Sequence, residues 1–253
     1  MENELKPALI IGNGPSVDQL DPKIFDHFTT FGCNHICKKF PDWGRETDNV
    51  VITDSNRIRE IGSAYKDYKG GLFIGDERYA NPPVKRIREI IGRDFVPLRQ
   101  LKKETLDRIP QIDGICWHKL LFSTVFHKLR FTFDFDRGLN FGYSVVTSAI
   151  QIAAIQGHKT ILLTGVDSSY NSDKDYFKGM VGKIDFVNYD FIKNPRLFME
   201  PVLALAQVYL EELGVRLIDC TPGGKLQFIS KGSFATLPPF FKIDRDIKYP
   251  SPL

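Results

Sequence analysis

A short apolar run that breaks into a glycine turn constrains this chain more than any other feature of its sequence. Residues 8–11 (Ala-Leu-Ile-Ile) form the run, and residues 12–16 (Gly-Asn-Gly-Pro-Ser) follow it directly. Four consecutive apolar residues bounded by turn formers predict a buried strand of a parallel sheet. Gly12 and Gly14 allow positive φ and leave the backbone bare, so a ligand can approach the main-chain N–H groups closely.

A helix is expected after this turn. Pro15 and Ser16 fit its first turn or N-cap, and the amino end of a helix favours an anion. We interpret the segment as the site of a phosphate-bearing ligand, most simply a nucleotide. Val17 stands where the dinucleotide fingerprint has its third glycine, and no Gly-Lys-Ser/Thr follows as in a P-loop. A tight turn without any ligand is the alternative explanation.

Further apolar runs predict the other strands of the sheet. They cover residues 29–33, 50–53, 72–74, 95–98, 114–117, 160–164 and 215–220. Residues 145–154 and 195–213 predict long helices, which end at Gly157 and Gly214. Because strands and helices alternate, we expect an α/β fold with a Rossmann-like, mostly parallel sheet and helices on both faces.

The chain is predicted to form a single α/β nucleotide-binding domain over residues 1–253. Residues 99–137 are irregular and rich in phenylalanine, which indicates an insertion. Residues 171–194 are polar and aromatic without a clean period. A long irregular segment inside a compact domain is usually functional or disordered, and this one follows a strand end, so we expect a lid over the site.

Composition excludes several classes of protein. The net charge is +3 over 253 residues, and the basic residues at 85–88 are flanked by acidic ones, which favours a solvated helix face over a nucleic-acid partner. No run approaches the roughly 18 apolar residues of a membrane span, and the amino terminus lacks a signal-peptide pattern. The four cysteines form no C-x-x-C pair. We therefore expect a cytoplasmic protein, with at most peripheral contact at the inner face of the membrane.

Acidic residues stand at several predicted strand ends. Asp54 follows the run at 50–53, Asp76 follows the run at 72–74, and Asp167 follows the run at 160–164. A carboxylate at such a place can act as a general base, hold Mg²⁺ with a partner, or simply cap the next helix. Asp167 is the strongest functional candidate because it lies beside the predicted lid.

Four fragments, taken in order, carry a resemblance to known families. They are Ile-Ile-Gly-Asn-Gly-Pro-Ser at 10–16, Phe-Gly-Cys-Asn at 31–34, Ile-Leu-Leu-Thr-Gly-Val-Asp at 161–167 and Cys-Thr-Pro-Gly-Gly at 220–224. Together they resemble the bacterial sialyltransferases of glycosyltransferase family 42 and the related MptE-like domain family. The MptE-like group includes a 6-hydroxymethylpterin diphosphokinase and a domain of flagellin glycosylation factors. Residues 60–135 match poorly.

The resemblance implies a binding site for a CMP-sugar donor. Its expected nucleotide- and donor-binding residues are Gly12, Asn13, Gly14, Pro15, Ser16, Asn34, Asp54, Asn56, Tyr143, Ser144, Gly165, Thr221, Pro222 and Gly223. In the sialyltransferases the glycine loop and the asparagine after the cysteine contact the donor. Tyr143 and Ser144 occupy the place of a hydroxyl-rich turn that also touches the donor, and the loop from Thr221 closes over the cytidine.

The catalytic residues implied by the resemblance depart from the family pattern. The sialyltransferases use a lid histidine as general base, and here no histidine follows His158. A carboxylate can do this work, and the candidates are Asp167, Asp173, Asp175 and Asp190. Tyr170 and Tyr176 resemble the paired tyrosines that stabilise the departing phosphate.

Details of sequence place the chain nearer the MptE-like group. That group often carries Gly-Val-Asp-His after the central strand, and Ser168 replaces the histidine here. The fragments Asp-Tyr-Phe at 175–177 and Thr-Pro-Gly-Gly-Lys at 221–225 fit this group better than the sialyltransferases. Some of its members are associated with surface-glycan synthesis.

The first functional hypothesis is a glycosyltransferase. It would move a sialic-acid-like or Kdo-like sugar from a CMP-activated donor to a glycan or lipid-linked glycan at the cell surface. A helix amino end and tyrosine hydroxyls would meet the charge of the leaving group, so no metal or other cofactor is expected. The family resemblance also implies a homo-oligomer.

Two alternatives stay open. A Mg-dependent pyrophosphokinase of the 6-hydroxymethylpterin diphosphokinase type would use the strand-end carboxylates to hold magnesium and ATP. No lysine-containing phosphate loop supports it. The other alternative is a nucleotide-binding module without catalysis, which the absence of the lid histidine favours.

Overall fold

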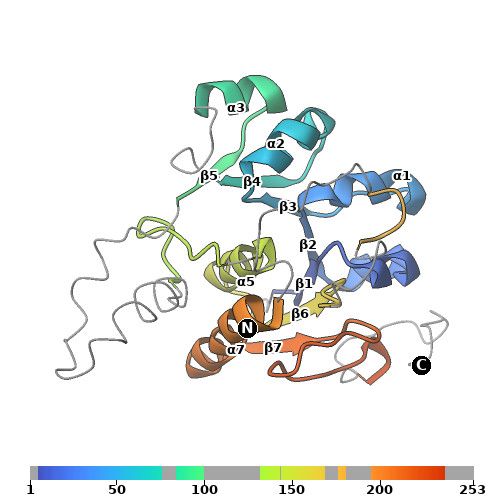
Figure 1. The fold of residues 1–253 in the computed structure, drawn as a ribbon, viewed down its shortest axis with the longest axis vertical. Coiled ribbons are helices and arrows are strands. Elements are labelled where there is room, and N and C mark those ends of the chain that lie inside the picture. The colour runs from blue at the N-terminus through green and yellow to red at the C-terminus, as the bar shows by residue number, and fades with distance from the viewer. Residues whose placement is uncertain are drawn as a thin grey trace.

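The computed structural model describes residues 5–75, 84–99, 132–142, 144–168, 176–180 and 195–236. Within these ranges the strands form a seven-stranded sheet in the order β5-β4-β3-β2-β1-β6-β7 (Figure 1). They are β1 (Ala8–Ile11), β2 (Thr29–Cys33), β3 (Asn49–Ile52), β4 (Gly71–Gly75), β5 (Val96–Leu98), β6 (Thr160–Thr164) and β7 (Arg216–Asp219). Each neighbouring pair of these strands is parallel, which confirms the Rossmann-like prediction.

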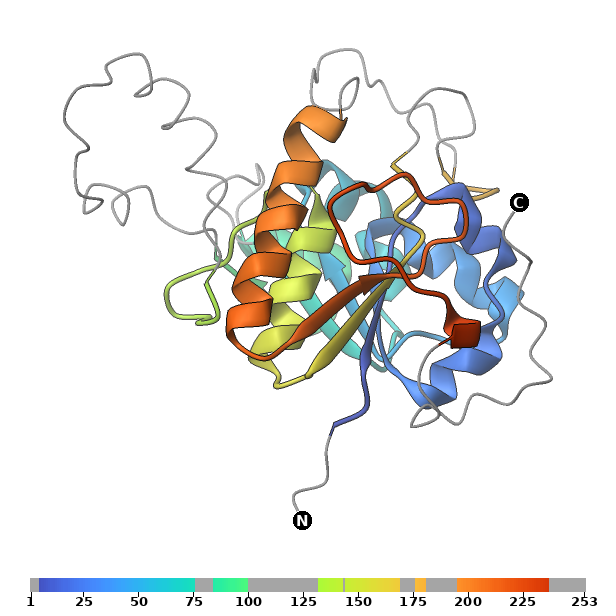
Figure 2. The ribbon, with the colours of Figure 1, turned by 90° about the horizontal axis from the view of Figure 1, so that it is seen from below.

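Helices cover both faces of the sheet (Figure 2). The α-helices of the described residues are α1 (Phe40–Trp43), α2 (Ser55–Ile61), α3 (Val84–Ile91), α5 (Val145–Ile155) and α7 (Pro195–Glu212). Short 3-10 helices are η1 (Pro15–Gln19), η2 (Pro22–His27), η3 (Asn34–Lys39), η4 (Gly62–Tyr65) and η7 (Phe234–Thr236). Helices α5 and α7 lie together on one face, and the N-terminal 3-10 helices lie on the other.

An apolar core on each face of the sheet explains why the sequences of the central strands are continuously hydrophobic. Ala8 and Ile10 of β1 join the core under α5 and α7. Leu9 and Ile11 join the core under the opposite helices. All four side chains are fully buried, because successive residues of a strand point to opposite faces and both faces are covered.

The order of the strands creates a switch point between β1 and β6. The chain runs outward from β1 through β2, β3 and β4 to β5, and it then returns to place β6 on the other side of β1. The loops after β1 and β6 therefore lead to helices on opposite faces of the sheet. In open α/β sheets ligands bind at the carboxyl ends of the strands, at such a point.

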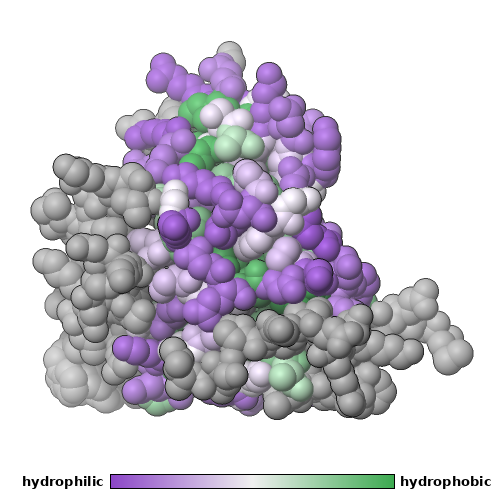
Figure 3. Space-filling model, turned by 90° about the vertical axis from the view of Figure 1, so that its right-hand side faces the viewer, coloured by the Kyte–Doolittle hydropathy of each residue, from purple (hydrophilic) through white to green (hydrophobic). Residues whose placement is uncertain are grey.

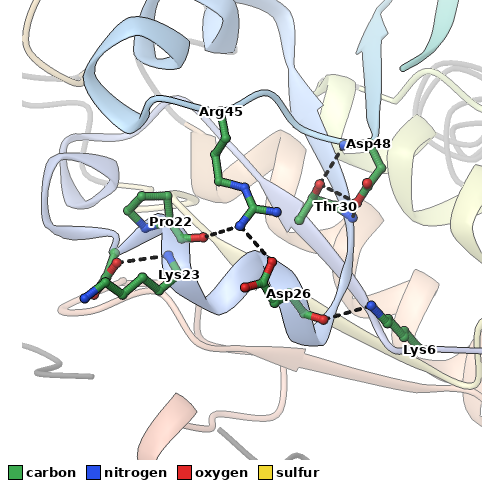
Figure 4. Close-up of polar contacts among 8 residues, drawn as sticks. Lys6, Pro22, Lys23, Asp26, Thr30, Arg45 and Asp48 are labelled. Atoms are coloured by element: carbon green, nitrogen blue, oxygen red, sulfur yellow. Dashed lines mark hydrogen bonds and ion pairs between the residues drawn. The ribbon is translucent and has the colours of Figure 1, made fainter. Parts of the chain in front are cut away.

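Polar contacts tie the amino ends of the strands together at the other edge of the sheet (Figure 4). The Asp48 carboxylate accepts hydrogen bonds from the N–H and the hydroxyl of Thr30, both at 2.8 Å, and the Asp48 N–H donates back to the Thr30 hydroxyl at 2.7 Å. Arg45 lies 2.9 Å from Asp26, whose carbonyl accepts from Lys6. These contacts fasten β1, β2 and β3 at the edge away from the predicted site.

The surface of the described residues is mostly polar, because most of their apolar side chains are buried in the two cores. Figure 3 shows the side of the molecule that lies to the right in Figure 1, where hydrophilic residues dominate the described surface and hydrophobic ones form small separate groups. In α3, Arg86 and Arg88 are exposed and Ile87 is buried, as expected of a solvated helix face. Among the described helices, none has the length and apolar character needed to cross a membrane.

Some predictions differ from the structure or lie outside the described residues. The helix predicted after the glycine turn is η1, a 3-10 helix of five residues. The predicted strand at 114–117 lies outside the described residues, as does most of the insertion at 99–137. Of the predicted lid at 171–194, the structure describes residues 176–180.

Candidate functional site

The loops after β1 and β6 approach each other so closely that side chains are excluded. The N–H of Gly12 donates to the Thr164 carbonyl and the N–H of Gly14 donates to the Gly165 carbonyl, both at 2.8 Å. A Cβ on Gly12 would lie 2.3 Å from the Gly165 oxygen. A Cβ on Gly14 would lie 1.8 Å from Oδ2 of Asp167. Glycine is therefore required at both positions by the packing of the two loops.

Close packing of the two loops, rather than a positive φ, explains why residues 12 and 14 are glycines. Neither Gly12 nor Gly14 has a positive φ, and Gly14 is extended at φ −69°. The positive φ that glycine allows is not used here, and the N–H groups expected to meet a ligand donate instead to carbonyls of the opposing loop. Gly165, on the opposing loop, does adopt the left-handed conformation at φ +69°, where a Cβ would also meet the Val17 side chain at 2.4 Å.

Asp167 is held by Ser16, the second residue of η1. The Ser16 hydroxyl donates to Oδ2 at 2.8 Å, and the Ser16 N–H donates to Oδ1 at 3.2 Å. Burial raises the pKa of Asp167, and the two bonds from Ser16 oppose that rise. The amino end of η1, where we expected a ligand anion, is thus capped by a carboxylate of the chain itself.

The loop after β7 packs against the same place. The Thr221 hydroxyl accepts a hydrogen bond from the N–H of Val166 at 3.2 Å, and the N–H of Lys225 donates to the Asp167 carbonyl at 3.0 Å. Thr221 is buried, whereas Pro222 is partly exposed and Gly223 is exposed. The structure therefore brings the residues predicted at 221–223 beside Asp167.

The end of β2 adds an asparagine with an unusual backbone. β1 and β2 are parallel neighbours with Ile11 opposite Gly32, so Asn13 and Asn34 lie in the segments that follow the carboxyl ends of two adjacent strands. Asn34 has a φ of +44°, in the left-handed region that few residues other than glycine adopt.

The two asparagines share a second feature. The Oδ1 atoms of Asn13 and Asn34 are both buried, and neither finds a hydrogen-bond partner in the described part of the chain. Buried acceptors are normally paired, and leaving one unpaired costs about 1–3 kcal/mol. We interpret the two atoms as acceptors for donor groups of a ligand.

The start of α5 lies at this edge as well, because α5 runs antiparallel to the strand that follows it. Ser144 is its N-cap, and the Ser144 hydroxyl accepts from the N–H of Val146 at 3.3 Å. The hydroxyls of Thr147 and Ser148, in the next turn, are buried without a hydrogen-bond partner within the described ranges. Tyr143 lies outside the described residues.

Asp54 and Asn56 are farther away. They follow β3, which β2 separates from β1. Asp54 is the N-cap of α2 and accepts from the N–H of Asn56 at 2.8 Å. Both side chains are exposed. The structure accounts for Asp54 as a helix cap and does not bring it together with Asp167.

Residues 176–180, which we call the strap, pack onto the glycine loop. The N–H of Phe177 donates to the Asn13 carbonyl at 3.0 Å, and the Phe177 ring is fully buried. The N–H of Lys178 donates to Oδ2 of Asp18 at 2.8 Å, and Lys39 lies 5.7 Å above the Phe177 ring. This part of the predicted lid is therefore anchored to the site.

The other catalytic candidates can be placed only in part. Tyr176 is partly buried and packs against the core on the η1 side of the sheet. Tyr170, Asp173, Asp175 and Asp190 lie outside the described residues. Among the residues that the structure describes, no group of three His, Cys, Asp or Glu side chains is arranged to hold a metal ion.

Sequence reasoning missed one residue of this edge. Ser168 was noted only as the replacement of a family histidine, but it is a second non-glycine residue with positive φ, at +53°. Its hydroxyl is buried and has no hydrogen-bond partner among the described residues. Its place directly after Asp167 was the one signal that could have identified it.

Comparison with known proteins supports the fold. No protein-family model matches the chain, and no curated protein matches its sequence. Among solved structures, the chain is similar to a MAf glycosyltransferase from Magnetospirillum magneticum AMB-1, with a TM-score of 0.55 and 15% sequence identity. The match covers 96% of this chain and 36% of the other, so the chain spans about a third of that protein's length. The Rossmann-like architecture is thus shared with that enzyme.

Proposed function

We propose that the chain is a glycosyltransferase that uses a nucleotide-sugar donor, bound where β1, β2, β6 and β7 end. The observation that carries the proposal is the pair of buried Oδ1 atoms of Asn13 and Asn34, which follow the neighbouring strands β1 and β2 and have no hydrogen-bond partner among the described residues. These are hydrogen-bond acceptors gathered at a switch point, where ligands of this fold class bind. The MAf glycosyltransferase with the same fold supports the class of reaction.

The charges at this edge suggest how a donor would lie. A carboxylate already caps η1, so a phosphate placed there would be repelled by Asp167. Hydroxyl or amino groups of a nucleoside or sugar would instead meet Asn13 and Asn34. The amino end of α5, with the hydroxyls of Ser144 and Thr147, offers donors and a favourable dipole for the phosphate. CMP is the nucleotide that the sequence resemblance favours.

Asp167 is the proposed general base. Its raised pKa suits it to take the proton of an acceptor hydroxyl while that oxygen attacks the anomeric carbon of the donor sugar. A new C–O bond forms, the bond from the anomeric carbon to the phosphate oxygen breaks, and its electron pair leaves with CMP. Tyr170 and Tyr176 are proposed to stabilise the departing phosphate.

The finer assignments follow the sequence resemblance. We propose a sialic-acid-like or Kdo-like sugar, a glycan or lipid-linked glycan acceptor, and a homo-oligomer acting in the cytoplasm or peripherally at the inner membrane face. We also propose that transfer needs no metal. Asp54 and Asp167 follow β3 and β6, with β2 and β1 between them, so they are poorly placed to share Mg²⁺.

A donor-cleavage assay tests the proposal. The protein would be incubated with CMP-, UDP- and GDP-activated sugars in the presence of EDTA, and release of the free nucleotide would be measured. We expect release from a CMP-sugar, and Asp167→Asn should slow it by about a hundredfold or more because the general base is lost. Mg-dependent formation of AMP from ATP, without cleavage of any nucleotide-sugar, would instead support pyrophosphoryl transfer.

A further inference from the structure

A buried tyrosine lies directly behind Asn34. The Tyr65 hydroxyl donates to the Asn34 carbonyl at 2.5 Å and accepts from the N–H of Cys37 at 3.4 Å. Tyr65 is 1% exposed, so no solvent competes for its hydroxyl. It is the last residue of η4, and its hydroxyl reaches the first turn of η3 across the core on that face of the sheet.

Asn34 needs such a support. A non-glycine residue in the left-handed region costs of the order of 1 kcal/mol or more, and the surroundings must hold it there. The hydrogen bond from Tyr65 fixes the peptide plane between Asn34 and His35, which is the plane that a return to the ordinary right-handed or extended conformation would rotate.

The next residue is anchored from a different helix. His35 is fully buried, and its Nε2 lies 3.1 Å from Oε1 of Glu60. The other carboxylate oxygen of Glu60 lies 2.8 Å from Arg57. Tyr65 and Glu60 thus hold both sides of the turn that begins at Asn34. Because Tyr65 is buried and its hydroxyl contacts the Asn34 carbonyl, we expect its effect on a ligand to pass through Asn34.

We propose that Tyr65 is a positioning residue for the donor site. Its hydroxyl keeps Asn34 in the left-handed conformation, and this conformation holds the Asn34 carboxamide at the sheet edge beside Asn13. The inference rests on the proposed function, since it assigns Tyr65 a part in binding the nucleotide of the donor.

The chain contains a matched control three residues away. Tyr68 is 3% exposed, belongs to the same core, and donates its hydroxyl to the Thr47 carbonyl at 2.8 Å. Thr47 precedes β3 at the opposite edge of the sheet. Tyr65→Phe and Tyr68→Phe therefore delete the same atom from the same core, and only the first deletion touches the carbonyl of Asn34.

The first arm of the test is calorimetric titration of CMP into the three proteins, with urea unfolding as a check on the fold. Both variants should lose similar stability. We expect the CMP dissociation constant to rise about tenfold in Tyr65→Phe, the factor that corresponds to one hydrogen bond, and to stay unchanged in Tyr68→Phe. The urea unfolding curve gives the folded fraction of each variant without denaturant, and dividing out that fraction separates a loss of folded protein from a loss of affinity.

The second arm is NMR of the ligand-free proteins, which does not depend on the proposed function. The carbonyl ¹³C of Asn34 and the amide ¹⁵N of His35 should shift in Tyr65→Phe and not in Tyr68→Phe. If neither resonance moves, Tyr65 does not hold Asn34 and the inference is overturned. If they move but both variants bind CMP like the wild type, the positioning role is overturned. Wild-type protein that binds no nucleotide would overturn the proposed function and the binding role together, while the NMR arm would still decide the role of Tyr65 in the turn.

Discussion

At the scale of single residues, the contact between Gly14 and Asp167 ties the two loops of the switch point together. Gly14→Ala would place a methyl group 1.8 Å from the Asp167 carboxylate. We expect it to cost about 1–3 kcal/mol in free energy of unfolding and to displace the carboxylate from Ser16. Part of this cost should disappear when Asp167 is also alanine, with a coupling of about 1 kcal/mol in a double-mutant cycle measured by urea unfolding.

Gly44→Ala is the control for that cycle. Gly44, unlike Gly14, has a positive φ, at +64°, and no atom lies within 4 Å of its missing Cβ. Its substitution should cost about 1 kcal/mol through backbone strain and be additive with Asp167→Ala within about 0.5 kcal/mol. If Gly14→Ala and Asp167→Ala are as additive as Gly44→Ala and Asp167→Ala, the predicted contact between Gly14 and Asp167 is contradicted.

The charge of Asp167 gives a prediction about pH. Burial raises its pKa in the folded protein above the ordinary value of 3.8. As pH rises through the interval between the two values, the unfolded chain releases its proton first, so the folded state loses stability. Asp167→Asn cannot titrate. The free energy of unfolding of the wild type, relative to this variant, should therefore fall as pH rises through that interval, and urea unfolding at several pH values measures it.

The opposite slope would mean that Ser16 outweighs burial and holds the pKa below 3.8. The same titration bears on catalysis. Because a general base must be ionised, donor cleavage should increase with pH along the ionisation of Asp167. Activity that is constant across the interval would argue against Asp167 as the base.

Sequence reasoning found Asp167 from its place after an apolar strand, but it could not find the partner of Asp167. Ser16 lies 151 positions earlier, and only the pairing of β1 with β6 brings the two together. The same pairing explains Gly12 and Gly14, which the sequence indicated as a ligand turn. The positive φ values of Asn34 and Ser168 also depend on tertiary contacts, since no local sequence pattern specifies them.

At the scale of elements, the strap at 176–180 is anchored mainly by Phe177. Replacing its fully buried ring with alanine should cost about 3 kcal/mol of local stability. Amide hydrogen exchange in the strap, including the N–H that donates to Asn13, should then become roughly a hundredfold faster. Exchange measured by mass spectrometry on a peptide that spans residues 176–180 tests this.

Phe228→Ala is the control, because Phe228 is 63% exposed and its loss removes little buried area. It should leave exchange in the strap unchanged. Equal exchange in Phe177→Ala and the wild type would show that the strap is held without its aromatic anchor.

The strands and long helices were predictable because their signals are local. The predicted bounds of β2 and β6 match the structure, and α5 and α7 begin at the predicted residues and end before Gly157 and Gly214. The 3-10 geometry of η1 was not predicted. Its first turn is set by the Asp167 carboxylate that caps it, and that carboxylate comes from another part of the chain.

At the scale of the whole molecule, contacts that stabilise the fold lie at the amino ends of the strands, and the proposed donor site lies at their carboxyl ends. A variant at the amino ends separates these two roles. Asp48→Ala removes the carboxylate that accepts two hydrogen bonds from Thr30. We expect a loss of about 1–2 kcal/mol in free energy of unfolding, with an unchanged CMP dissociation constant per folded molecule. Urea unfolding and calorimetry measure the two quantities.

Asp26→Ala provides the comparison at the same edge. Asp26 pairs with Arg45 at the surface, where ion pairs add little, so this variant should be nearly as stable as the wild type. A weaker affinity for CMP in Asp48→Ala would mean that the two edges are coupled rather than independent.

The fold class followed from the alternation of strands and helices, but the strand order did not. That β6 returns to the side of β1, and so creates the switch point, depends on which apolar faces pack together over the whole domain. Asp54 shows the consequence. Like Asp167 it was predicted to follow a strand, although Asp167 was the stronger functional candidate, and the strand order places Asp54 away from the switch point as a helix cap.

The most direct test of the account is a thermal-shift titration with CMP, CDP, ATP and GTP, each with and without Mg²⁺. A nucleotide at a hundredfold excess over its dissociation constant stabilises the folded state by about 2.7 kcal/mol. We predict stabilisation by CMP or CDP without metal, lost in Asn34→Ala and retained in Asp48→Ala. Stabilisation by ATP or GTP alone and only with Mg²⁺, or an equal shift in Asn34→Ala, would contradict a donor site at the ends of β1, β2, β6 and β7.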